Sequence, residues 1–251
     1  MRLTTYIFIS VLIASFIGCK SGGQENSSKQ KPGTLKPSTP VKATVRDDDF
    51  VNTGPYVKPT IKNGRFIGTR EYSKGRGKYP VEFSMNIPKG WKMIDIGPKP
   101  SKNLVQFIKY AKSGGEVKIF AVGHFRHTGS YTRSVKANIR LLSKLMNQML
   151  GQFKVQFDQA GLKSEYKDSG ITRKRGMLEY RVDFKLDRWI NKKSPPGPYY
   201  FTMLCRPRLD HKPHGVIFML FSRQDDQITS NDTMLQKGEI AKLLKSFRFE
   251  N

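Results

Sequence analysis

The sequence has few cysteines, few acidic residues and no apolar run long enough to cross a lipid bilayer. Its longest apolar stretch, 6–17, has about a dozen residues, whereas a transmembrane helix needs about 20. We therefore expect no membrane-spanning helix. The only cysteines are Cys19 and Cys205. If Cys19 is modified, Cys205 has no partner within the chain, which excludes an intramolecular disulfide.

The sequence also lacks the local motifs of the common enzyme classes. It contains no glycine-rich phosphate loop between a strand and a helix, no Gly-x-Ser-x-Gly and no His-Glu-x-x-His. We therefore expect no catalytic residues, no cofactor and no enzyme activity. The alternative is an enzyme whose site is assembled from distant residues, because such a site leaves no local motif.

Acidic side chains are scarce relative to basic ones. The chain has 20 Asp and Glu against 45 Lys and Arg, a formal net charge of +25. A surface this basic attracts polyanions, such as lipopolysaccharide, acidic wall polymers or anionic phospholipid head groups. The alternative is a generally basic surface that has no specific ligand.

What the sequence does contain begins with an export signal. Arg2 precedes the apolar core, which closes on Gly18 and Cys19. The segment resembles the signal and lipobox of bacterial lipoproteins, in which Cys19 would become the lipidated first residue. Phe16 and Ile17 stand where lipoboxes favour leucine and a small residue. The alternative is a signal whose cysteine is incidental. Because the protein is predicted to be exported, we do not expect chromosomal nucleic acid as a partner.

Composition divides the chain into three parts: a signal peptide at 1–18, a lipidated cysteine with a disordered tether at 19–64, and a single domain at 65–251. The tether is rich in Ser, Gly, Lys, Pro and Gln, and such a segment buries too little apolar surface to offset its ordering entropy. Its acidic triplet, Asp47 to Asp49, is interpreted as solvated charge.

The domain shows the two periodicities of regular secondary structure. Apolar residues at every fourth or third position predict a long amphipathic helix at 134–157, and Asp232 is predicted to cap a C-terminal helix. Alternating or continuous apolar patterns predict strands at 79–87, 104–110, 116–125, 164–173, 178–186, 199–206 and 216–223. The predicted fold is α+β, with a mostly antiparallel sheet of six or seven strands between the long helix and the C-terminal helix, an αβα sandwich.

Two short motifs near the ends of the domain resemble PsbP-like, Mog1-like and DcrB-like domains. The first is FSMNIPKGWK at 83–92, and the second is LLKSFRFE at 243–250. The resemblance covers about 65–251. It implies an αβα sandwich used for binding, assembly or scaffolding, without a shared set of catalytic residues. Ile87, Pro88, Gly90 and Trp91 match as fold-forming residues only.

The histidines form a candidate metal site in the sequence. All four occur in two His-x-x-His pairs, His124 with His127 and His211 with His214. Imidazole is a common zinc and copper ligand, but neither pair has a cysteine partner or lies on a predicted helix. We expect no metal and retain the four histidines as candidates. Cys205 falls in the apolar phase of a strand and is predicted to be a buried structural thiol rather than a nucleophile.

Basic residues cluster in predicted turns and strand ends. If these clusters converge on one rim of the sheet, they predict binding of an anionic partner, whereas scattered clusters would be ordinary solubilising charge. The candidates are Lys74, Arg76, Lys78, Arg173, Lys174, Arg175, Arg206, Arg208 and Lys212, and Lys192 and Lys193 form a further basic pair.

We therefore expect a protein anchored by lipid to a bacterial membrane, in the outer membrane or facing the periplasm if the cell is Gram-negative. There it would act as a non-enzymatic binding or assembly factor for an envelope protein or an anionic polymer. The alternatives are an envelope enzyme that acts on an anionic polymer and a purely structural envelope lipoprotein.

Overall fold

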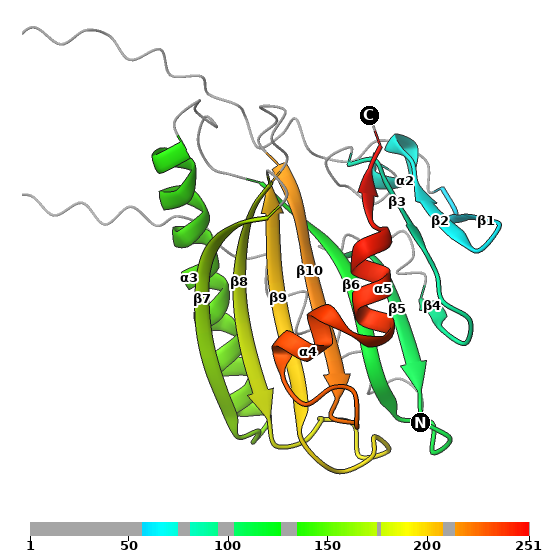
Figure 1. The fold of residues 1–251 in the computed structure, drawn as a ribbon, viewed down its shortest axis with the longest axis vertical. Helices are drawn as coiled ribbons and strands as arrows, with labels where there is room; N and C mark the ends of the chain where they lie inside the picture. Colours follow the sequence, from blue (N-terminus) through cyan, green and yellow to red (C-terminus); the bar gives the residue numbers. More distant parts are fainter. Residues whose placement is uncertain are drawn as a thin grey trace, which may run out of the picture.

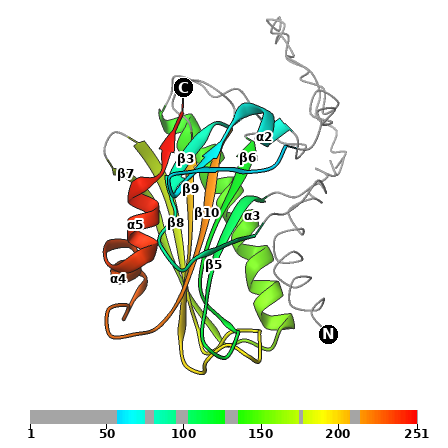
Figure 2. The same ribbon diagram turned by 90° about the vertical axis from the view of Figure 1, so that its right-hand side faces the viewer.

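The computed structural model describes residues 57–74, 81–94, 103–126, 135–174, 177–207 and 214–250. These residues form three layers (Figures 1 and 2). A seven-stranded sheet lies in the middle, with a long helix on one face and two short helices and a four-stranded sheet on the other. The predicted α+β class, with a mostly antiparallel sheet between helices, is confirmed.

The central sheet is built from hairpins. Every neighbouring pair is antiparallel, and the strands after the long helix return across the sheet until β10 pairs with β6. In spatial order the strands are β4 (Lys92–Ile94), β5 (Asn103–Tyr110), β6 (Glu116–Arg126), β10 (His214–Arg223), β9 (Tyr199–Pro207), β8 (Met177–Leu186) and β7 (Ser164–Lys174).

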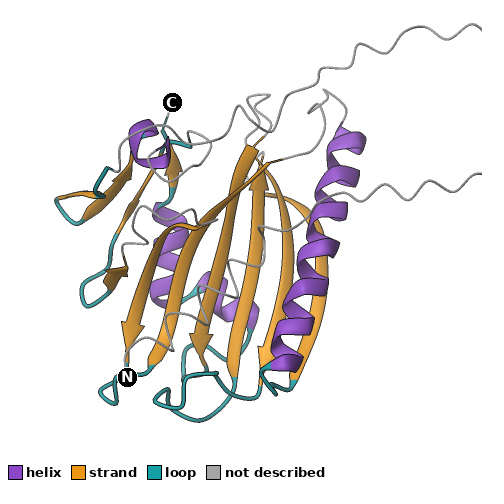
Figure 3. Ribbon diagram, turned by 180° about the vertical axis from the view of Figure 1, so that it is seen from behind, coloured by secondary structure: helices purple, strands orange, loops and turns teal. Residues whose placement is uncertain are grey.

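Helix α3 (Val135–Gln159) covers one face of this sheet, as Figure 3 shows from behind. Its buried residues recur every three or four positions, which places them in one stripe. The stripe packs on aromatic residues of β8 and β9. The ring centroids of Phe153 and Phe201 are 5.1 Å apart, and those of Phe157 and Phe184 are 5.2 Å apart. The buried residues are Leu142, Met146, Met149, Phe153 and Phe157.

The opposite face carries a second core. Phe247 lies at its centre, with its ring 5.3 Å from that of Phe83 and 4.8 Å from that of Phe218. The elements on this face are β1 (Thr60–Lys62), β2 (Arg65–Gly68), α2 (Arg70–Lys74), β3 (Phe83–Asn86), α4 (Asn231–Gln236), α5 (Gly238–Ser246) and β11 (Arg248–Phe249).

Two N-terminal strands are arranged differently from the sequence prediction. The strand expected at 79–87 is β3, which belongs to the small sheet β1-β2-β3-β11, and the seventh member of the central sheet is β4. The chain turns between them at Gly90, whose φ is +85°, and Trp91 returns to the second core as expected. Among the described residues, strand β1 already starts at Thr60, five positions before Arg65, where the sequence predicted the domain to begin.

The C-terminal helix is two helices, and its predicted cap is wrong. Ser230 caps α4, because its hydroxyl accepts a hydrogen bond from the backbone of Thr233 in a capping box. Asp232 lies in the first turn instead. Gly238, with φ +71°, begins α5 after a break at Lys237.

No helix within the described residues combines the length and the apolar character needed to cross a membrane.

Candidate functional site

The strand register brings several predicted residues to one end of the central sheet. Arg173 and Lys174 end β7, Arg206 lies near the end of β9, and His214 begins β10 opposite Arg126, the last residue of β6. The β7–β8 and β9–β10 connections therefore start and finish at this end, which we call the basic end. The two connections with their flanking residues, 173–175 and 206–214, contain six Lys or Arg and one acidic residue.

Helix α2 is held near the same end. The hydroxyl of Tyr72 donates to the backbone carbonyl of Leu104 at 2.6 Å. Leu104 is the second residue of β5, and the first residue of β5 pairs with Gly123 near the end of β6. Lys74, the last residue of α2, therefore follows a segment anchored beside the basic end.

One predicted basic pair lies at the opposite end of the sheet. Lys192 and Lys193 belong to the β8–β9 connection, which packs against the β5–β6 turn. The Ser113 hydroxyl donates to the Lys193 carbonyl at 2.8 Å. A Cβ on Gly115 would lie 2.2 Å from the carbonyl carbon of Lys193, so this close approach requires glycine. The basic clusters are thus divided unequally between the two ends.

Arg206 differs from the other anion-binding candidates because its charge is compensated inside the fold. Its Nη2 lies 2.7 Å from Oε2 of Glu179 on the neighbouring strand, and only 12% and 11% of the two side chains are exposed. The guanidinium also lies 5.0 Å from the ring centroid of Phe218, a cation–π contact. Arg206 is therefore a structural ion-pair residue here.

The histidine pairs are only partly within the described residues. His124 in β6 lies opposite Val216, two positions from His214 in β10, so the backbone brings one histidine of each pair to neighbouring strands. His127 and His211 lie outside the described residues. Within the described ranges, no group of three or more His, Cys, Asp or Glu forms a metal-binding arrangement. A site that uses all four histidines stays untested.

Several other predicted residues also lie outside the described part of the chain. These are Cys19, Arg76, Lys78, Arg175, Arg208 and Lys212.

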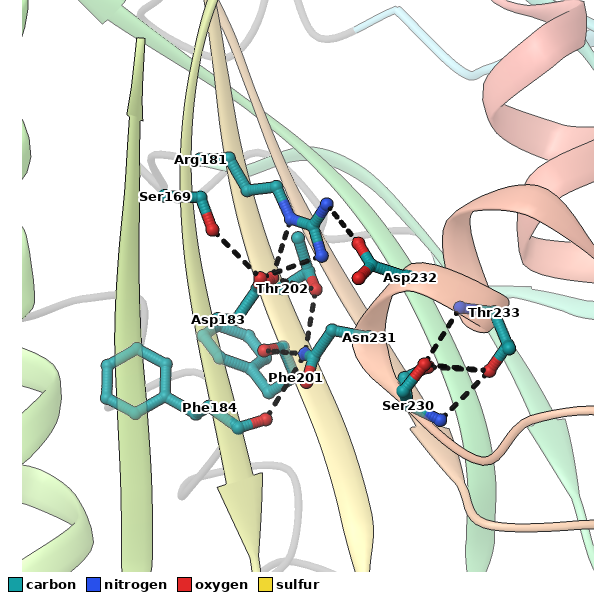
Figure 4. Close-up of polar contacts among 10 residues, drawn as sticks. All are labelled: Ser169, Arg181, Asp183, Phe184, Phe201, Thr202, Ser230, Asn231, Asp232 and Thr233. Atoms are coloured by element: carbon teal, nitrogen blue, oxygen red, sulfur yellow. Dashed lines mark hydrogen bonds and ion pairs between the residues drawn. The ribbon is translucent and has the colours of Figure 1, made fainter. Parts of the chain in front are cut away.

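The sequence prediction missed a buried polar network between β8 and α4 (Figure 4). Its centre is Asp183, which is 5% exposed. One carboxylate oxygen accepts hydrogen bonds from Arg181 Nε at 2.9 Å and from the Thr202 hydroxyl at 2.7 Å. The other lies 2.7 Å from Arg181 Nη2 and accepts from Ser169 at 3.3 Å. All the polar capacity of this carboxylate is used within the fold.

The network holds α4 on the sheet. The Asn231 side-chain amide donates to the carbonyl of Phe201 and to the Thr202 hydroxyl, both at 2.9 Å. Arg181 Nη1 also reaches Asp232 at 2.7 Å. Burial lowers the pKa of Arg181, but hydrogen bonds and charge from Asp183 and Asp232 outweigh it and raise the pKa above its ordinary value.

The alternation of β8 explains why the network was missed. Arg181 and Asp183 alternate with apolar residues, and this pattern is typical of a solvent-facing phase. In the structure α4 covers that phase, and Glu179 and Asp183 are buried. One residue in the sequence could have indicated the network. Asn231 lies at the start of a helix, two residues before Thr233 of the capping box, and a polar side chain in such a position has backbone groups within reach.

These residues do not provide an acid–base or nucleophilic couple. Asp183 is occupied by a guanidinium and two hydroxyl groups, so it has no free lone pair directed at a substrate. Cys205 is buried as predicted. Burial raises the pKa of its thiol well above the ordinary value, and the charge of Glu179 raises it further, so the reactive thiolate is disfavoured.

Comparison with known proteins gives little further information. No protein-family model matches the chain, and no curated protein matches it. Among solved structures, the chain is similar to cyanobacterial PsbP (CyanoP) from Synechocystis sp. PCC 6803, with 12% sequence identity and a TM-score of 0.41 over 67% of this chain and 86% of that chain. A TM-score this low carries no functional argument, so the fold class rests on the elements of this chain.

Proposed function

We propose that this protein is an exported, lipid-anchored bacterial protein that binds an anionic partner through the basic end of its sheet. It would act as a binding or assembly factor at the cell envelope rather than as an enzyme. The observation that supports the binding role is the strand register, which brings the ends of β6, β7 and β9 and the start of β10 together. Cationic side chains from separate hairpins would then contact one ligand.

The internal pairing of acidic residues supports this choice. Glu179, Asp183 and Glu239 each have a basic partner at 2.7 Å. Glu179 compensates Arg206, and among the described residues none of the three carboxylates pairs with another basic residue counted at the basic end. Clustered cations at one end of a sheet attract phosphate- and carboxylate-bearing polymers, and the attraction weakens as salt screens it.

The test compares two double variants with the same loss of charge. Arg208→Gln with Lys212→Gln removes two cations from the β9–β10 connection, and Lys192→Gln with Lys193→Gln removes two from the opposite end. Binding to heparin, a soluble polyanion probe, is measured from 50 to 300 mM salt. We expect the first variant to bind roughly tenfold more weakly at low salt and to show a shallower salt dependence.

The second double variant should bind nearly as the parent does. Equal losses in the two variants would mean that net charge alone drives binding and would contradict the proposed site. Cross-linking in intact cells would then identify the natural partner, with the same pair of variants as the comparison.

A further inference from the structure

Within the described residues, strand β7 leaves the central sheet with one long edge. It is the last strand in the order and pairs with β8 along Ser164–Lys174, whereas the strand at the other edge, β4, has only three residues. Glu165, Tyr166 and Lys167 are consecutive and all exposed. On both phases, therefore, this part of the edge is largely open to solvent.

One exposed aromatic side chain lies on this edge. Among the described residues, the exposed large hydrophobic side chains are Ile61, Val155 and Tyr166. Val155 belongs to α3, which runs along β7 in Figure 1. The ammonium of its neighbour Lys154 lies 3.3 Å from the ring centroid of Tyr166. Of these three side chains, Tyr166 therefore lies on the β7 edge itself and contacts α3 through Lys154.

From these observations we propose that β7 pairs antiparallel with β7 of a second copy of this chain, about a two-fold axis between Ser169 and Gly170. The two sheets would join into one continuous sheet, with both α3 helices on the same face. In this register the facing residues are Glu165 with Lys174, Tyr166 with Arg173, Lys167 with Thr172, and Asp168 with Ile171.

Charge complementarity favours this register. The acidic residue Glu165 lies near the start of β7 and Lys174 at its end, so antiparallel self-pairing forms two opposite-charge pairs by symmetry. Lys167 faces the neutral Thr172, and the register contains no pair of like charges. A shift that opposes Lys167 to Arg173 or Lys174 would add repulsion.

A bulge in β7 allows the residues that face each other in this register to lie on the same face of the sheet. The pairing of β7 with β8 skips Ser169, between Asp168 and Gly170, and the Ser169 hydroxyl is bonded to Asp183. In a regular strand, Glu165 and Lys174 would fall on opposite faces because they are an odd number of positions apart. The extra residue moves them to one face, as cross-strand neighbours require. A bulge hinders pairing of an edge with unrelated strands, whereas an identical β7 has its bulge at the matching position.

A charge-swap series on the full-length chain, purified in detergent, tests the proposal by sedimentation at physiological salt. We expect the parent to dimerise and Lys174→Glu to raise the dimer dissociation constant roughly tenfold, since it replaces two attractive pairs by two repulsive ones. Glu165→Lys should raise it as well, and this variant also loses the 4.0 Å contact of Glu165 with Lys185 in the same copy. The double variant has the parent's net charge and restores both attractive pairs. It should dimerise as the parent does.

Disulfide trapping tests the register independently. The double variant Lys167→Cys with Thr172→Cys should form a covalent dimer on mild oxidation. In the proposed register, the cysteine at position 167 of one copy faces the cysteine at position 172 of the other. Within one copy these positions are about 16 Å apart along the strand, which excludes an internal disulfide, and neither single variant should cross-link efficiently. A monomeric parent at 100 µM, or a double charge swap that does not recover dimerisation, would overturn the proposal.

Discussion

Asp183 is the residue on which the position of α4 depends most. Its carboxylate receives a bidentate contact from Arg181 and a hydrogen bond from Thr202. Asp183→Ala would leave a largely buried guanidinium with Asp232 alone, and Asp232 is mostly exposed. Because a buried ion left without its partner is costly, we expect a loss of about 3 kcal/mol in the free energy of unfolding, measured by urea denaturation.

A matched control separates this effect from the loss of any acidic residue. Asp226 lies exposed in the turn between β10 and α4, and Asp226→Ala should change the free energy of unfolding by less than about 0.5 kcal/mol. If Asp183→Ala were as mild as the control, the network would not stabilise α4, and its role would have to be sought elsewhere.

At the same scale, the sequence predicted apolar residues better than charged ones. The buried Cys205 and the buried stripe of α3 follow directly from periodicity. The roles of Arg206 and Asp183 could not be predicted, because both depend on partners from other elements, Glu179 on β8 and Thr202 on β9. Alternation shows which face of a strand a residue occupies, but not whether a later helix covers that face.

Helix α5 is attached to the sheet through an ion cluster in its first turn. Lys109 and Lys118 face each other across β5 and β6, and like charges in that position repel. Glu239 offsets the repulsion, with 2.7 Å to Lys109 Nζ and 3.4 Å to Lys118 Nζ. Burial raises the pKa of Glu239, but these two lysines outweigh burial and lower the pKa below the ordinary value.

The direction of this pKa shift fixes the pH dependence. A carboxyl group whose pKa is lower in the folded state stabilises the protein above the unfolded pKa, about 4.3, and the contribution is lost as the pH falls through the folded pKa. We expect Glu239→Gln to lower the free energy of unfolding by about 1 kcal/mol at pH 7. The difference from the parent should shrink below about pH 4.3.

Urea denaturation of both proteins from pH 7 to pH 3 measures this difference. Glu71→Gln, an exposed change in α2, is the control and should leave the pH profile of the parent unchanged. A constant difference between Glu239→Gln and the parent across the whole range would show that the carboxylate charge is not what stabilises α5.

The sequence predicted the elements well and their assignment to sheets less well. The hairpins of the central sheet are local in sequence, and their alternation specifies both strands. By contrast, β3 joins the small sheet through β2 and through β11 at the far end of the chain. Such a long-range pairing leaves no periodic signal, so β3 was recognised as a strand but placed in the wrong sheet. The break before α5 depends on Gly238, which periodicity does not register.

For the whole molecule, charge and topology act together. The excess of Lys and Arg was evident from composition, but their distribution depends on strand direction. Antiparallel hairpins return alternate connections to the same end, so the β7–β8 and β9–β10 connections share one end and the β8–β9 connection lies at the other. The proposed partner would thus approach from one direction.

The lipid anchor would keep the protein at a membrane surface, within reach of a partner there. Cys19 follows a small residue at the end of an apolar core, and we expect its thiol to be alkylated with lipid before the signal is removed. Cells grown with radioactive palmitate should label the parent chain and should not label Cys19→Ala, and the variant should leave the membrane fraction. Cys205→Ala is the control and should keep the label, because Cys205 is fully buried. Label that persists in Cys19→Ala would rule out the anchor.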